Sequence, residues 1–131
     1  MDITAGGTFE IESWEPEIID DEPGASLGRV RITKVFHGDL KGTSTAHLLT
    51  VADGAGNPAV YVAVERFTGE VLGRRGSFVL HHSAPGSHGE RLAVRVVPGT
   101  GTEDLTGLTG AFEILNDTDG GHSYTLEGQL G

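Results

Sequence analysis

The sequence predicts an all-β protein, an eight-stranded antiparallel up-and-down β-barrel. Apolar and β-branched residues alternate with polar residues through most of the chain, which is the period of a half-buried strand. Turn signals separate these stretches at short intervals, and glycine reaches 21 of 131 residues without a collagen-like repeat. No stretch has credible helical spacing. Such a pattern is typical of a sandwich or a closed barrel. We favour the barrel because the strands follow one another as hairpins and closure leaves no open strand edge.

The N-terminal segment predicts one strand and one loop. Residues 4–14 alternate, with Phe9 and Ile11 on one face and acidic or polar residues on the other. Residues 15–28 are rich in acidic side chains and contain two prolines and Gly24. Because prolines and glycines interrupt regular structure, we predict that this segment is a loop.

Two further strands are predicted before the middle of the chain. Residues 28–36 alternate and place Lys34 on the same face as Phe36, among apolar side chains. Residues 43–52 form the third predicted strand. The sequence DGAGNP at 53–58 is a strong turn signal.

The longest apolar stretch, residues 59–82, predicts two strands joined by a turn at 68–70. In its first strand Glu65 and Arg66 are neighbours and therefore point to opposite faces. Whichever face turns inward carries a charge into apolar surroundings. Burying a charge costs free energy unless an opposite charge pairs with it, so a buried charge points to an ion pair or a functional role.

The C-terminal part predicts the remaining strands. A loop is expected at 83–89 and a sixth strand at 91–97. The glycine- and threonine-rich segment 98–110 is expected to be a compact loop that closes one end of the barrel, its glycines permitting a tight path. Residues 111–115 and 123–130 are predicted to form a closing hairpin.

Composition narrows the function classes. The length suits a single domain, 1–131, and the absence of cysteine excludes disulfides, thiolate metal sites and a thiol nucleophile. A net charge of −10 argues against nucleic-acid binding. No signal-peptide pattern and no apolar run of about 20 residues is visible. We therefore expect a soluble cytoplasmic protein that binds neither nucleic acid nor membrane.

Glu65 is the first candidate catalytic residue. It shares a face with Tyr61 and Phe67, and burial there would raise its pKa and suit it to acid/base chemistry or to stabilising a cation. The alternative is a structural ion pair with Lys34 or an interior arginine. Tyr61 and His81 are the candidate partners in catalysis, His81 because an imidazole titrates near neutrality.

Candidate ligand-binding residues are the side chains expected to line the barrel interior. A cavity of about 300 Å³ or more would favour ligand binding, whereas an interior filled by aromatic rings would favour a structural role. No metal and no cofactor is predicted, because His81 and His82 point to opposite faces and no metal-binding motif is present. The candidates are Lys34, Phe36, His47, Phe67, Phe78 and Tyr124.

Six motifs along the chain are familiar: GTFEIESW, KVFHGDLKG, ERFTG, GRRGSFVLHH, VVPGTGTEDLTGLTG and GGHSYTLEGQL. In these motifs the chain resembles a bacterial family of small proteins, DUF3224. The resemblance covers nearly the whole chain and implies a fold similar to the allene oxide cyclase barrel, whose relatives are cofactor-free cyclases and isomerases. Around His47 the family often has an acidic residue followed by an aromatic one, whereas this chain reads AHLL.

These observations lead to one functional prediction and one alternative. The barrel is predicted to bind a small hydrophobic or polyketide-like molecule in a central cavity, acting as a cofactor-independent cyclase or isomerase in which Glu65 supplies acid/base or charge stabilisation. The alternative is a non-catalytic carrier or a structural homo-oligomer. The face formed by Val60, Val62 and Val64 would suit association of barrels.

Overall fold

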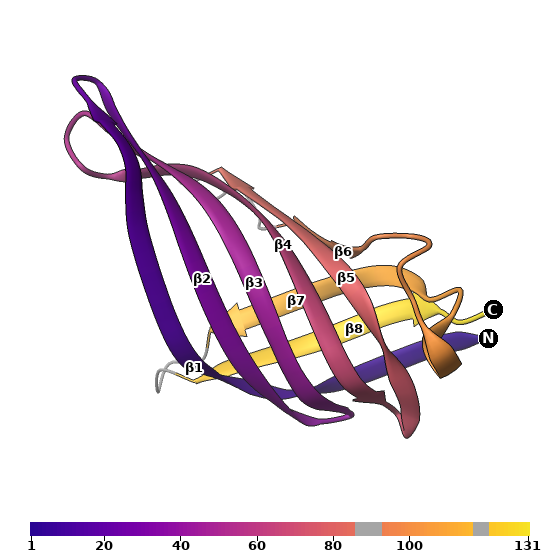
Figure 1. Ribbon diagram of the computed structural model, residues 1–131. Helices are drawn as coiled ribbons and strands as arrows, with labels where there is room; N and C mark the ends of the chain where they lie inside the picture. Colours follow the sequence, from indigo (N-terminus) through magenta and orange to yellow (C-terminus); the bar gives the residue numbers. More distant parts are fainter. Residues whose placement is uncertain (86–92, 117–120) are drawn as a thin grey trace.

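The computed structural model describes residues 1–85, 93–116 and 121–131, and it is a closed antiparallel barrel of eight strands (Figure 1). Each strand pairs with the next along the chain, and β8 returns to pair with β1. This confirms the predicted fold class and excludes the sandwich. The strands are β1 (Asp2–Glu22), β2 (Ala25–Gly38), β3 (Leu40–Asp53), β4 (Pro58–Val71), β5 (Arg74–Pro85), β6 (Ala93–Val96), β7 (Thr109–Asn116) and β8 (His122–Gln129).

The only helical element in the described ranges is a short 3₁₀ turn, η1 (Glu103–Leu105). It lies in the segment 98–110 that the sequence predicted as a compact loop, and its Leu105 is fully buried in the core together with Leu108. No helix of the described residues is long and apolar enough to span a membrane.

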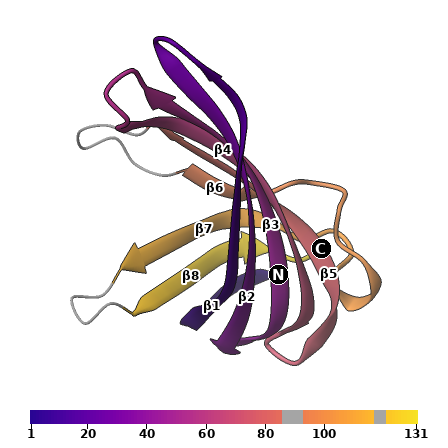
Figure 2. The same ribbon diagram turned by 60° about the vertical axis from the view of Figure 1, so that its left-hand side comes forward.

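The strands β1 to β4 extend well beyond β7 and β8 (Figures 1 and 2). β1 pairs with β8 only up to Phe9, but it pairs with β2 as far as Glu22. The prediction of a loop at 15–28 is therefore wrong, because this segment completes β1 and starts β2. Pro16 is tolerated there, since the segment lies at an edge of the sheet where one side of the backbone needs no partner.

The turn of the central hairpin also differs from the prediction. Gly69 remains within β4 and pairs with Gly42 of β3, and the turn lies at Leu72 and Gly73. A Cβ atom at Gly69 would lie 2.2 Å from the carbonyl oxygen of Lys41. Glycine at 69 thus serves the close approach of two strands rather than a turn.

Three predictions fall partly outside the described residues. The loop predicted at 83–89 is a strand up to Pro85, and its remainder lies outside them. The start of the strand predicted at 91–97 also lies outside them, and its described part is β6. Residues 117–120, which fall within the predicted closing hairpin, lie outside them as well.

One half of the barrel interior is filled by aromatic rings. Phe36, Phe67 and Phe78 are almost completely buried, and the ring centroids of neighbouring pairs lie 5.2–5.4 Å apart. Tyr124 packs against Phe36, and its hydroxyl accepts a hydrogen bond from the Leu40 N–H at 2.8 Å and donates one to the carbonyl oxygen of His37 at 3.0 Å. These rings hold the closed half of the barrel together.

Candidate functional site

The other half of the interior is hollow. A cavity of about 590 Å³ lies between the long strands, with β7 and β8 supplying part of its wall. Its volume falls within the usual range for small-molecule sites. The lining side chains that carry the argument below are Trp14, Ile32, Lys34, Leu48, Tyr61 and His82.

The cavity wall is mainly apolar and changes in character along its length. Val30, Ile32 and Ala46 form a buried apolar cluster with Leu48 packed against it. Trp14, 58% exposed, lines the cavity where it meets solvent, whereas His82 and Lys34 line a buried part of its wall. A ligand would therefore meet an apolar channel that ends in polar groups.

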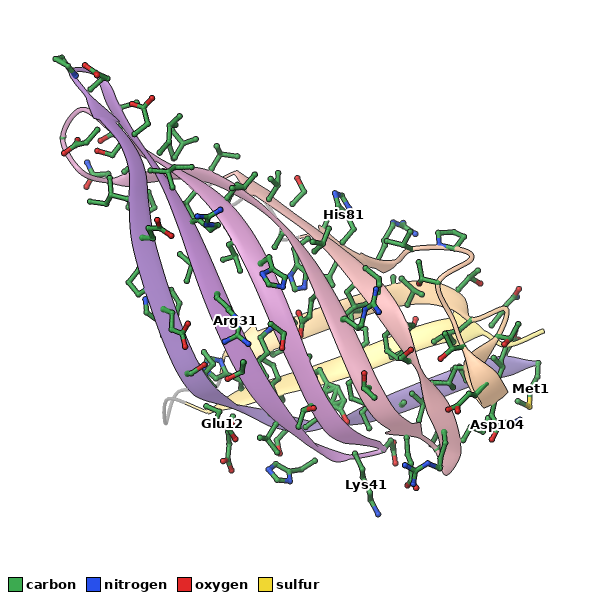
Figure 3. The ribbon with its side chains drawn as sticks, in the orientation of Figure 1. Met1, Glu12, Arg31, Lys41, His81 and Asp104 are labelled. Atoms are coloured by element: carbon green, nitrogen blue, oxygen red, sulfur yellow. The ribbon has the colours of Figure 1, made fainter. Side chains whose placement is uncertain are left out.

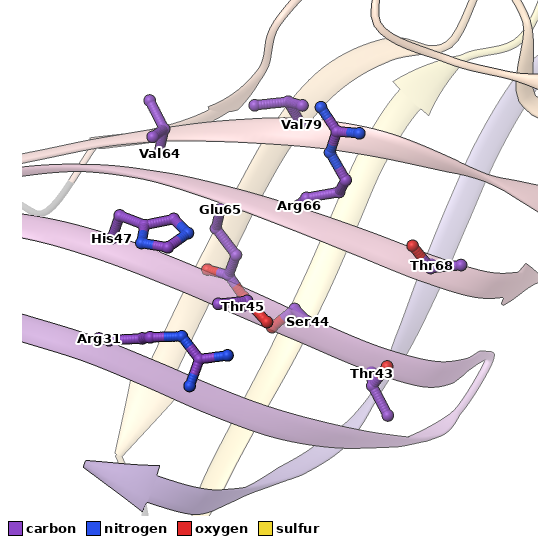
Figure 4. Close-up of a pocket in the computed structure, with 10 residues that line it drawn as sticks. All are labelled: Arg31, Thr43, Ser44, Thr45, His47, Val64, Glu65, Arg66, Thr68 and Val79. Atoms are coloured by element: carbon purple, nitrogen blue, oxygen red, sulfur yellow. The ribbon is translucent and has the colours of Figure 1, made fainter. Parts of the chain in front are cut away.

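The polar end is organised by one buried carboxylate. Glu65 is 1% exposed, and its Oε1 accepts a hydrogen bond from the Lys34 ammonium at 3.1 Å and bonds His82 Nε2 at 2.7 Å. Its Oε2 accepts a hydrogen bond from the Ser44 hydroxyl at 2.5 Å. Figure 4 shows the Glu65 side chain reaching from β4 toward Ser44 on β3. The structure thus shows the ion pair with Lys34 that the sequence left as the alternative.

The hydrogen-bond and charge partners of Glu65 lower its pKa, whereas the sequence predicted a raised pKa. Burial alone would raise the pKa, but the hydrogen bond from His82, the charges of Lys34 and His82 and the hydrogen bond from Ser44 together lower it to about 2. The expectation of a raised pKa at Glu65 is therefore wrong. An ionised carboxylate with three donors is a weak base, and its suitable role is to orient its neighbours.

Tyr61 lies where the sequence placed it, on the inner face of β4 next to the cavity. Desolvation, and then the negative charge of Glu65, raise the pKa of the Tyr61 phenol, so it stays protonated at neutral pH. Its hydroxyl makes no hydrogen bond within the described part of the chain.

His47 and His81 do not line the interior. Both are exposed on the outer wall, and Figure 3 shows His81 projecting away from the sheet. His47 instead lines an outer groove of about 520 Å³ together with Arg31 and Arg66 (Figure 4). The histidines that line the cavity are His82 and His122, and neither was a predicted site residue. The alternation of residues in β5 could have identified His82 as inward-facing, since His82 shares a face with the buried Phe78.

The aromatic residues proposed as ligand contacts have a different place. Phe36, Phe67, Phe78 and Tyr124 fill the closed half of the barrel and are not part of the cavity wall. Lys34 is the one ligand-binding candidate that does line the cavity.

Other contributors to the cavity had no clear signal in the sequence. Trp14 lines its outer end, although the sequence had placed Trp14 at the end of the first strand without a role. His122 of β8 lines the cavity and stacks on Phe9 at a centroid distance of 4.9 Å. Within the ranges that the structure describes, no three His, Asp or Glu side chains gather closely enough to hold a metal ion.

Comparison with known proteins identifies the family. The family model described as "Protein of unknown function (DUF3224)" matches residues 5–127. A similar solved structure is that of a protein with unknown function from the DUF3224 family of Shewanella oneidensis MR-1, with 32% sequence identity and a TM-score of 0.88, covering 100% of this chain and 99% of that chain. No curated protein gives a significant match. The chain therefore belongs to the DUF3224 family.

Proposed function

We propose that the protein binds a small, largely apolar molecule inside its barrel. The observation that supports this most directly is the 590 Å³ cavity with an apolar wall and a polar inner end. Sites for small molecules are mostly apolar clefts that place a few polar groups at fixed positions. The closed half of the same barrel is filled by aromatic rings, so the interior is not hollow throughout.

Binding of a neutral fluorescent probe tests this proposal. N-phenylnaphthylamine, which fluoresces in apolar surroundings, is expected to bind one site per chain. Leu48→Trp should weaken this binding at least about tenfold, because Leu48 lines the cavity and a larger ring would fill it. Fluorescence titration of the folded proteins measures the effect.

The matched control is Leu49→Trp, which adds the same ring one residue further along β3. Leu49 is 54% exposed and lies on the outer wall, so its variant should bind the probe as the unchanged protein does. Failure of the folded wild-type protein to bind the probe, or equal weakening by both substitutions, contradicts the proposal.

The second candidate is a cofactor-free cyclase or isomerase, and the hydrogen bond between His82 and Glu65 favours it. Because an ionised carboxylate only accepts, His82 Nε2 is the donor in this bond, which fixes the ring and leaves Nδ1 of a neutral imidazole to accept a proton from a substrate. In this form of the function His82 touches the substrate, and Glu65 positions His82.

Hydrogen exchange in a bound ketone distinguishes catalysis from binding alone. An enzyme of this kind is expected to exchange the hydrogens next to the carbonyl of a small apolar ketone for deuterium, as followed by NMR. His82→Gln should abolish the exchange, while His81→Gln on the outer wall should leave it intact. If wild type and His82→Gln exchange at the same rate, His82 has no catalytic role.

A further inference from the structure

The cavity wall carries hydrogen-bond donors that the described residues use only in part. The Lys34 ammonium carries three N–H groups, and Glu65 is its one hydrogen-bond acceptor among the described residues. Lys34 also lies 4.9 Å from the centroid of the Phe9 ring, which holds the cation at the cavity wall. The Tyr61 hydroxyl is a further donor without a partner in the described ranges.

The acceptors of the same cluster are already engaged. Both oxygens of Glu65 are bonded, to Lys34, Ser44 and His82, and Glu65 itself does not line the cavity. A cationic group on a ligand would therefore find no open carboxylate there. It would also lie next to the Lys34 ammonium, which would repel it.

The charges of the cluster balance in a way that leaves room for an anion. Lys34 and Glu65 cancel each other, so the pair alone presents no net charge to the cavity. Within this pair only Lys34 lines the cavity, so an anionic group on a bound molecule would meet the ammonium and not the carboxylate.

We infer, on the basis of the proposed function, that the ligand is an amphiphilic carboxylic acid. Its carboxylate accepts a hydrogen bond from Lys34 at the polar end of the cavity. Its apolar body lies along Ile32, Leu48 and Trp14. Charge-assisted hydrogen bonds to the carboxylate supply the preference for an acid over an uncharged molecule of the same shape.

Competition with the neutral probe tests this inference. Decanoate and decanamide have the same chain length and differ in the charge of the head group. Decanoate is expected to displace N-phenylnaphthylamine at concentrations at least about tenfold lower than decanamide, because a hydrogen bond to a charged group stabilises a complex more than a neutral one. Quenching or a spectral shift of Trp14, the only tryptophan, gives an independent readout at the cavity end.

Substitutions test whether the preference for decanoate over decanamide depends on Lys34. The double variant Lys34→Met/Glu65→Gln removes both charges of the pair together and should bind both ligands equally. Lys41→Met removes the same positive charge at an exposed position and should keep the full preference for decanoate.

The outcomes separate this inference from the proposed function. Equal binding of decanoate and decanamide by the wild-type protein overturns the carboxylate assignment and leaves binding in the cavity standing. A preference for decanoate that persists in the double variant overturns it as well. Failure of the probe itself to bind overturns the proposed function instead.

Discussion

Glu65→Gln is expected to lower the free energy of unfolding by about 3–5 kcal/mol, because it leaves a buried cation without its counter-charge. Lys34 is buried and has its ion pair with Glu65 alone among the described residues. The amide of the variant can still accept from Ser44 but cannot offset a positive charge in apolar surroundings. Urea denaturation at pH 7, followed by circular dichroism, measures the change.

Two further variants isolate the cause. Lys34→Met/Glu65→Gln removes the stranded cation and should recover most of the lost stability, since replacing a buried pair with uncharged groups is often neutral. Glu17→Gln breaks an exposed pair with Arg29 at 3.0 Å and should cost less than about 1 kcal/mol. A Glu65→Gln variant as stable as wild type, or a double variant no more stable than the single one, would contradict this account.

The cluster around Glu65 also explains how the strands keep their register. Lys34, Ser44, Glu65 and His82 come from β2, β3, β4 and β5, one residue from each of four consecutive strands. A slip of one residue in any of these strands would turn its member of the cluster to the outer wall. The cluster therefore specifies the pairing of four strands in addition to shaping the inner end of the cavity.

Alternation along the strands predicted the barrel and which residues share a face, but not which face turns inward. Lys34 and Glu65 were placed on apolar faces from the sequence alone, and the structure joins them. Alternation says little about where a strand ends. The prolines and acidic residues of 15–28 suggested a loop, although an edge strand tolerates both.

The chemistry of the site was less predictable than its location. The expected rise in the pKa of Glu65 followed from burial, which is indeed the largest single influence. The opposing influences come from His82, Lys34 and Ser44, which lie 17, 31 and 21 residues away in the chain. Contacts between strands distant in sequence depend on register, and register is visible only in the folded structure.

The free energy of unfolding at acid pH should reveal the contribution of the Glu65 carboxylate. The pKa of Glu65 is 4.5 when unperturbed and about 2 in the folded protein. A carboxyl group whose pKa is lowered on folding stabilises the protein above its unfolded pKa, and this stabilisation is lost as the pH falls through the folded value. Between about pH 5 and pH 2 the protein should therefore lose roughly 3 kcal/mol through Glu65 alone.

The Glu65→Gln variant separates this contribution from those of the other carboxylates. Exposed acidic residues titrate alike in both proteins and cancel when the two are compared. A protonated Glu65 carries no charge, and neither does the amide of the variant. The difference in unfolding free energy should consequently be large at pH 7, shrink below pH 5 and nearly vanish close to pH 2. A difference that stays constant over this range would show that Glu65 does not stabilise the fold as an ionised group.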